Sequence, residues 1–163
     1  MKLAGAAALV LALCTSAASA QSLKQQIVGT WDFVVAEITA PDGKKSFPFG
    51  ETPKGILIFT PDGRFAQIHV ASDVPKFASG NRLSGTAEEY AAINRRSLAL
   101  FGSYTVDEAN KTVIVKFEGS SFAKFVGTEG KRVVTSIDDN EFRSMNPATS
   151  TGTKAESIWK RVK

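Results

Sequence analysis

The chain has 163 residues, a formal net charge of +4, one histidine and one cysteine. This length predicts a single domain with a core large enough to be stable. The basic charge is mild and includes no run of Lys or Arg, which argues against a nucleic-acid partner. One histidine and one cysteine leave mainly carboxylates to bind zinc, so we expect no metal site.

The first 20 residues have the features of a secretory signal peptide. A positively charged start precedes an uncharged apolar run over 3–13, and Ala18-Ser19-Ala20 is a small-x-small cleavage site. Cleavage after Ala20 leaves a mature domain of residues 21–163 and predicts a secreted or periplasmic location. A membrane anchor is one alternative, but a spanning helix needs about 20 apolar residues. A lipoprotein site at Cys14 is another, although Leu13 is bulkier than the small residue usual before such a cysteine.

Strands joined by tight turns are predicted for the first half of the mature domain. Stretches rich in β-branched and aromatic residues predict the strands. Pro-Asp-Gly sequences at 41–43 and 61–63 predict turns, because Pro presets φ and Gly accepts a positive φ. The predicted strands are 31–39, 45–49, 54–60 and 64–71.

A helix is predicted next, followed by more strands. Thr86 or Ser84 suits the N-cap, and two glutamates follow at the positive end of the helix dipole. Apolar residues at helical spacing predict that the helix extends to about Leu100; they are Tyr90, Ile93, Leu98 and Phe101. Strand patterns return over 103–107, 112–118, 131–137, 141–145 and 155–162.

The two ends of the mature domain predict that the sheet closes on itself. Gly29-Thr30-Trp31 opens the first strand, and Trp159-Lys160-Arg161 lies in the last. The Arg161 side chain can lie across the Trp31 indole only if these strands are neighbours, as they are in a closed barrel. We therefore predict a structural clamp of Trp31 and Arg161 on the floor of a barrel of about eight strands.

Six short sequences span nearly the whole mature domain: Val28–Trp31, Pro53–Arg64, Thr86–Tyr90, Gly102–Val106, Gly127–Glu129 with Arg132, and Ile158–Arg161. Their order and spacing resemble the lipocalin-like domain family of small bacterial and fungal proteins. The resemblance implies an all-β, antiparallel up-and-down β-barrel with one helix between the fourth and fifth strands. It also implies an internal pocket and, for most members, no settled activity. The chain departs from the family pattern at Phe101, where Tyr is frequent, and at Lys116, where His is common.

Alternation along the strands predicts which side chains face the barrel interior. One inward set is Trp31, Phe33, Val35 and Glu37; a second is Phe65, Gln67 and His69; a third is Val113, Val115 and Phe117. The resemblance implies that Tyr104 and Arg132 also face inward. The candidate ligand-binding residues are Gln67, His69, Tyr104, Phe117 and Arg132. A buried ion pair of Arg132 with Glu118 or Glu37 is the alternative role for that arginine.

These features predict a secreted protein that binds a small apolar or amphipathic molecule in its barrel, with Arg132, Tyr104 or Gln67 orienting a polar head such as a carboxylate. We expect no cofactor, no metal, no catalytic residue, no nucleic-acid partner and no stable membrane anchor; the oligomeric state is left open. Haem would have only His69 as an axial ligand, and a serine triad would lack a Gly-x-Ser-x-Gly elbow. The alternatives are an isomerase or cyclase that uses Tyr104, His69 or Glu118 as acid or base, and a filled barrel with a structural or interaction role.

Overall fold

The computed structural model describes residues 21–40 and 42–163, and the predicted signal peptide lies outside them. The helices are α1 (Leu23–Ile27), α2 (Ala87–Arg96) and the short 3-10 helix η1 (Ala123–Phe125). The strands are β1 (Gly29–Thr39), β2 (Lys45–Ser46), β3 (Lys54–Phe59), β4 (Arg64–Val70), β5 (Ser97–Asp107), β6 (Thr112–Ser120), β7 (Glu129–Ile137), β8 (Glu141–Asn146) and β9 (Ala155–Arg161).

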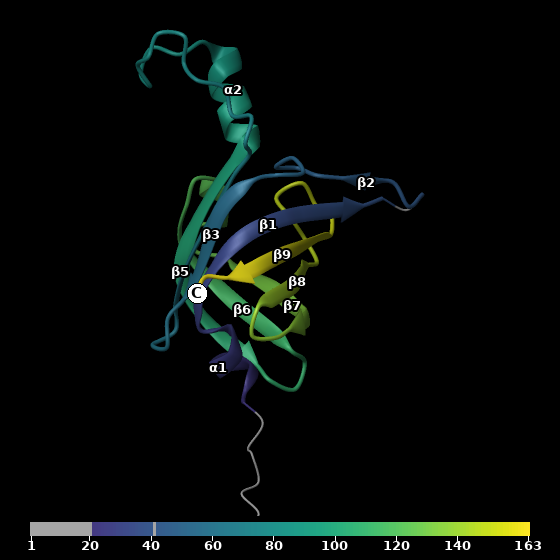
Figure 1. The fold of residues 1–163 in the computed structure, drawn as a ribbon. Helices are drawn as coiled ribbons and strands as arrows, with labels where there is room; N and C mark the ends of the chain where they lie inside the picture. The colour runs from purple at the N-terminus through teal and green to yellow at the C-terminus, as the bar shows by residue number, and fades with distance from the viewer. Residues whose placement is uncertain (1–20, 41) are drawn as a thin grey trace, which may run out of the picture.

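Eight of the described strands close into an antiparallel barrel. Neighbours follow the order β1-β3-β4-β5-β6-β7-β8-β9, and β9 pairs again with β1. β2 pairs with the far end of β1 and extends away from the barrel (Figure 1). α1 lies at one end of the barrel, and α2 projects beyond the opposite end (Figure 1). The predicted all-β barrel with a helix between the fourth and fifth strands is confirmed.

α2 begins at a capping box. The Thr86 hydroxyl oxygen accepts a hydrogen bond from the Glu89 N–H at 3.2 Å, and the Glu89 carboxylate accepts one from the Thr86 N–H at 2.8 Å. This reciprocal arrangement satisfies two N–H groups that the helix itself leaves without partners. None of the residues of α2 is buried, so this helix contributes nothing to the hydrophobic core.

The prediction that this helix continues to Leu100 is wrong. β5 begins at Ser97 and pairs with β4, which places Leu98 opposite His69 and Leu100 opposite Gln67. Residues paired in this way lie on the same face of a sheet. The two leucines therefore face the barrel interior, because pairing with β4 outweighs a spacing that fits a helix equally well.

A bulge in β1 changes which of its side chains face inward. Phe33 is buried, the pairing with β9 shifts between Phe33 and Val35, and the next buried residue is Ala36. One extra residue on a strand moves all later side chains to the opposite face. The prediction that Val35 and Glu37 face inward is therefore wrong. Glu37 lies on the outside and forms an ion pair with Lys45 at 2.9 Å.

The closed end of the barrel is built on a contact between β1 and β9. Trp31 is fully buried, and the Arg161 guanidinium lies 4.0 Å from the centre of its ring. The Trp31 indole N–H donates to the Ile27 carbonyl at 2.8 Å. Arg161 donates to the carbonyls of Gln26 at 2.6 Å and Val28 at 3.0 Å. This arginine thus links α1, β1 and β9.

Gly29 leaves room for the Arg161 guanidinium because it has no side chain. Its φ of +135° is a conformation that side-chain-bearing residues rarely adopt. A Cβ added there would also lie 2.8 Å from the Arg161 Nη1 atom. Both constraints explain why a glycine opens β1, two residues before the tryptophan.

We expect the contact between Trp31 and Arg161 to be a coupled contribution to stability. Trp31→Ala should lower the free energy of unfolding by about 3–5 kcal/mol through the void it leaves. Arg161→Ala should lower it by about 1–3 kcal/mol through lost cation–π and hydrogen-bond contacts. A double-mutant cycle in urea, repeated with the milder Trp31→Phe, measures the coupling. Losses that add within about 0.5 kcal/mol would show that the two side chains do not stabilise each other.

Candidate functional site

A cavity of about 160 Å³ opens at the end of the barrel opposite α1. Aromatic and aliphatic side chains from several elements form its wall: Ala36, Ile38, Phe49, Leu98, Leu100 and Phe125. Its polar side chains include those of Gln67, His69, Arg95 and Arg132. The other half of the barrel holds the aromatic core, in which Trp31 packs on Phe142 and Phe59 on Tyr104. The barrel is thus filled at its closed end and hollow at its mouth.

β4 supplies two neighbouring polar groups to this cavity. Gln67 and His69 are two residues apart on the strand, so both face inward, and both are buried. The Gln67 amide nitrogen lies 3.0 Å from His69 Nε2. An amide nitrogen can only donate, so Nε2 accepts and the neutral ring carries its proton on Nδ1. No hydrogen-bond partner for Nδ1 lies among the described residues.

His69 is held as a neutral ring in an aromatic environment. Its ring stacks on Phe33 with 4.0 Å between the centres, and Phe49 packs edge-on at 4.8 Å. Burial, with a smaller effect from the charge of Arg132, lowers the pKa of His69 from 6.5 to about 3. The imidazole is therefore uncharged at neutral pH.

Arg132 brings the positive charge into the barrel. It lies opposite the fully buried Val113 in the pairing of β6 with β7, so its side chain points inward. Arg132 is half-buried, and burial lowers its pKa to about 10. It therefore stays charged at neutral pH. Its hydrogen bond within the described chain is a donation to the Lys131 carbonyl at 2.9 Å.

The alternative role of Arg132 as the partner of a buried glutamate is wrong. Glu118 lies on the outer surface and forms an ion pair with Arg64 at 2.6 Å. Glu37 is also outside, because of the bulge in β1. No Asp or Glu among the described residues forms an ion pair with Arg132. Arg132 is thus charged, half-buried and without an ion-pair partner inside this part of the chain.

A small inner void of about 10 Å³ continues from the cavity toward the aromatic core. Gln67, Arg132 and Ser157 line both spaces, and Ser144 and Trp159 line the void. The Trp159 indole N–H is buried and has no acceptor among the described residues. Buried N–H groups in proteins almost always have a partner, so this donor marks a place where a polar atom fits.

The two remaining predicted site residues lie elsewhere in the barrel. Tyr104 is buried, its hydroxyl donates to the Thr60 carbonyl at 2.8 Å, and burial raises its pKa. Phe117 stacks on Phe125, with 5.2 Å between the ring centres, and supports the cavity wall from behind. Neither residue lines the cavity. The structure thus brings together Gln67, His69 and Arg132, while Tyr104 and Phe117 belong to the packing around them.

Several residues of the cavity escaped the sequence analysis. Phe49 falls in the strand predicted over 45–49, but β2 ends at Ser46 and Phe49 lies in the loop beyond it. Phe125 comes from a segment without a periodic pattern, and Leu98 fits a helix as well as a strand. The unpartnered Trp159 N–H depends on which groups surround it, and alternation along one strand does not contain that information. The Phe47-Pro48-Phe49 sequence was the one local signal, since aromatic residues beside a proline in a polar stretch suggest a packed loop.

The model of the lipocalin-like domain family matches residues 28–162, which is most of the chain. The chain belongs to this family. Among solved structures, the lipocalin-like chain is similar to the redesigned beta barrel b11L5F_LGL, with 16% identity, 89% of this chain and 99% of that chain covered, and a TM-score of 0.44. It is also similar to the redesigned beta barrel mFAP1 bound to DFHBI, with 18% identity, coverages of 86% and 100%, and a TM-score of 0.43. A comparison with curated proteins returned no match. These similarities carry no argument about function.

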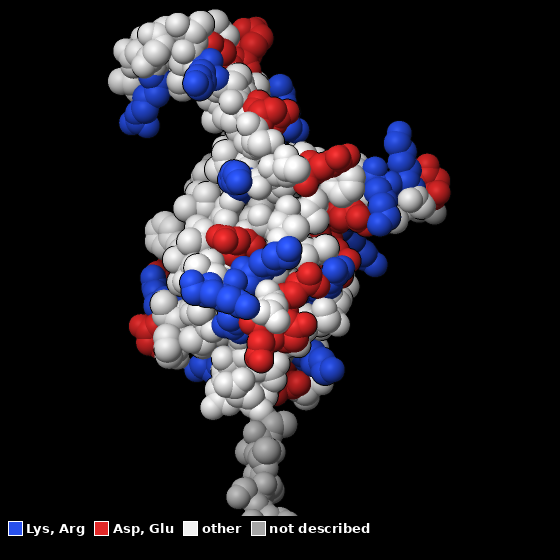
Figure 2. Space-filling model, in the orientation of Figure 1, with Lys and Arg blue, Asp and Glu red and all other residues white. Residues whose placement is uncertain are grey.

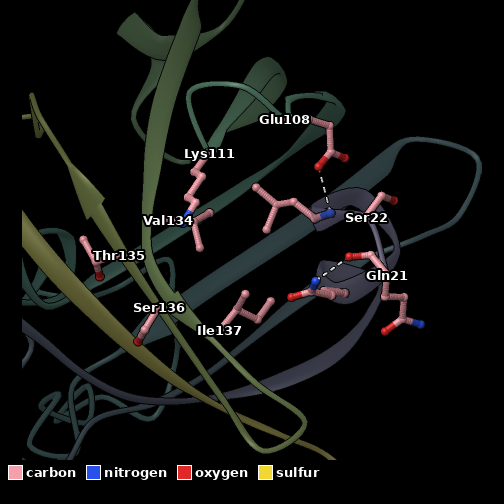
Figure 3. A pocket seen from close by; sticks show the side chains of 10 residues that line it. Gln21, Ser22, Glu108, Lys111, Val134, Thr135, Ser136 and Ile137 are labelled. Carbon is pink, nitrogen blue, oxygen red and sulfur yellow. Dashed lines mark hydrogen bonds between the residues drawn. The ribbon is translucent and has the colours of Figure 1, made fainter. Parts of the chain in front are cut away.

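The lipocalin-like barrel has a second depression, of about 470 Å³, beside α1 at its closed end (Figure 3). Glu108 at its edge accepts hydrogen bonds from the N–H groups of Leu23 at 2.8 Å and Lys24 at 3.0 Å. The first N–H groups of a helix have no partner within it, so this carboxylate anchors α1 to the turn after β5. We therefore assign the depression to the attachment of α1.

Other kinds of site were sought in the same part of the lipocalin-like chain. Residues 21–40 and 42–163 contain no group of three or more His, Cys, Asp or Glu side chains placed to hold a metal ion. None of the helices described is long and apolar enough to cross a membrane. Figure 2 shows Lys and Arg interspersed with Asp and Glu on the face in view, without a continuous basic patch there.

Burial of His69 should make the stability of the lipocalin-like barrel depend on pH. The unfolded ring binds a proton below its ordinary pKa of 6.5, and the folded ring only near pH 3. Between these values the unfolded state holds more protons, so the free energy of unfolding should fall as the pH drops. The contribution of this group is about 1.4 kcal/mol per pH unit well below 6.5. Urea denaturation at pH 7, 6, 5 and 4 measures it.

The matched control for this titration is His69→Gln, which keeps a polar side chain but cannot take up the proton. Carboxylates titrate in both proteins, so the informative quantity is the difference between their unfolding free energies at each pH. That difference should shift in favour of the variant as the pH falls. Two curves that stay parallel from pH 7 to pH 4 would contradict the buried, neutral assignment of His69.

Proposed function

We propose that this protein is secreted and binds a small amphipathic molecule in the cavity at the barrel mouth. The observation that carries the proposal is a cavity in which three polar side chains, Gln67, His69 and Arg132, lie among apolar residues of several strands. Sites for small molecules have this composition, in which apolar contact supplies affinity and a few polar groups set orientation. Membership of the lipocalin-like family supports the same reading of the barrel.

The size of the cavity limits what it accepts. Its volume of about 160 Å³ is smaller than most ligand pockets, which measure roughly 300–1,000 Å³. A cavity of about 150 Å³ is known to hold one benzene molecule. We therefore propose a molecule of the size of a single ring with a short polar substituent. A long acyl chain would exceed the space between the mouth and the aromatic core.

Binding is favoured over the alternative of an isomerase or cyclase. Of the three acid or base candidates for that chemistry, Glu118 is on the outer surface and Tyr104 is engaged with the Thr60 carbonyl. His69 remains in the cavity, but its pKa of about 3 makes it a poor proton acceptor at neutral pH. Acid–base catalysis needs groups that converge on one substrate, and these three do not.

Uncharged benzyl alcohol is the first probe of the cavity. We expect it to bind the wild-type protein saturably in a calorimetric titration. Ala36→Leu, which extends a side chain into the cavity, should weaken binding about tenfold or more. Ala99→Leu makes the same change on an exposed position of β5 and should leave the affinity within about twofold.

Thermal denaturation of both variants checks that they are folded. Absence of saturable binding to the wild-type protein would favour the filled barrel. An equal loss in the two variants would place the probe elsewhere on the molecule.

Secretion is tested separately from ligand binding. Expression of the full chain in a bacterium with a periplasm should give a periplasmic protein whose intact mass begins at Gln21, because the cleavage motif ends at Ala20. Replacing Ala18 and Ala20 by bulky residues should leave the precursor uncleaved. A wild-type protein that keeps its first 20 residues, or stays in the cytoplasm, would contradict this part of the proposal.

A further inference from the structure

We infer that the bound molecule is a compact carboxylate whose acid group points toward the closed end of the barrel and whose ring lies toward the mouth. The inference rests on the proposed function and adds the chemical class and the orientation of the ligand. It is argued from the direction of the unpartnered hydrogen bonds, the unbalanced charge and the shape of the space.

Three of the polar side chains around the base of the cavity, those of His69, Trp159 and Arg132, present hydrogen-bond donors. His69 Nδ1–H and Trp159 Nε1–H are buried, and neither has an acceptor among the described residues. The guanidinium of Arg132 has five N–H groups, one of which donates to the Lys131 carbonyl. A buried donor without an acceptor is costly. A ligand that offers acceptors and no donors, as a carboxylate does, matches all three groups.

The charge of the cavity points to the same class of ligand. The side chains that line the cavity and the inner void include Arg132 and Arg95 but no Asp or Glu. A buried cation without a counter-ion is unfavourable in a low-dielectric interior. A carboxylate can accept two parallel hydrogen bonds from a guanidinium, which is the arrangement that arginine favours with anions. An uncharged ligand of the same shape would leave the positive charge unbalanced.

The shape of the space sets the orientation. Arg132 and Gln67 stand at the boundary between the cavity and the inner void, and Trp159 lines the void. A void of about 10 Å³ has room for roughly one oxygen-sized atom. The acid group therefore fits at the inner end, and the ring fits between Phe49 and Leu98 nearer the mouth. The reverse orientation would place the acid beside Arg95, which is exposed at the end of α2.

Benzoate and benzyl alcohol form the test pair, since they share a ring and differ in charge. In calorimetric titrations at pH 7, we expect the wild-type protein to bind benzoate about 10- to 100-fold more tightly than the alcohol, the range for hydrogen bonds to a charged group. Arg132→Met should abolish this preference while leaving the affinity for the alcohol nearly unchanged. Lys131→Met is the matched control, because it removes the exposed cation next to Arg132 in β7 and should preserve the preference. Arg95→Met tests the reverse orientation, in which the preference would depend on Arg95.

The two tryptophans report the orientation. In proton–nitrogen NMR spectra each gives one indole N–H signal, and Trp159→Phe identifies the signals. The Trp31 N–H already donates to the Ile27 carbonyl, so its signal serves as an internal reference. Benzoate should move the Trp159 proton signal downfield, as expected for a new hydrogen bond to an anion, and leave that of Trp31 in place. Trp159→Phe should weaken benzoate more than the alcohol.

The outcomes separate this inference from the proposed function. Equal affinities for acid and alcohol would overturn the carboxylate and leave small-molecule binding intact. No binding of either probe would overturn both. A preference for benzoate that depends on Arg95, or that leaves the Trp159 signal unmoved, would overturn the inward orientation of the acid group. Circular dichroism of each variant confirms that an altered affinity comes from a folded barrel.

Discussion

The stacking of Arg161 on Trp31 is the contact on which the remaining structure depends. A sheet becomes a barrel only when its first and last strands pair, and this pair of side chains lies where β1 and β9 meet. The same guanidinium donates to the carbonyls at the end of α1, so Arg161 both joins β9 to β1 and holds α1 against the closed end of the barrel. Closure removes the sheet edges that would otherwise be open to other chains. It also fixes which side chains share an interior, which a flat sheet would not do.

The two halves of the barrel interior differ, because the closed half is packed with aromatic rings and the half at the mouth contains the cavity. In the closed half, Phe142 packs against both Trp31 and Phe59. Close-packed protein interiors tolerate little change in side-chain volume. The half at the mouth contains the cavity and the polar side chains of Gln67, His69 and Arg132. Trp159 belongs to both halves, since its ring packs on Phe33 and the residue also lines the inner void.

Local chemistry determined what could be predicted from the sequence. The turn at Pro61-Asp62-Gly63 and the N-cap at Thr86 depend on one or two residue types, and barrel closure could be deduced from a tryptophan and an arginine at opposite ends of the domain. The start of β5 could not, because Leu98 suits a helix and a strand equally and its pairing with His69 is a long-range contact. The isolation of Arg132 could not be predicted either. It depends on where Glu37 and Glu118 point, and therefore on the phase of two other strands.

The bulge in β1 keeps a carboxylate out of the barrel interior. Strict alternation from Phe33 through all residues of β1 would place Glu37 in the interior that Arg132 occupies. The carboxylate of Glu37 would then balance the charge of Arg132. One additional main-chain residue turns that carboxylate out to Lys45 and presents Ala36 and Ile38 to the cavity. The charge of Arg132 is thus left unbalanced because of the backbone of a strand that contributes no polar side chain to the cavity. Deleting Val34 would remove the extra residue, and regular alternation from Phe33 would still keep the Glu37 side chain outside and Ala36 inside.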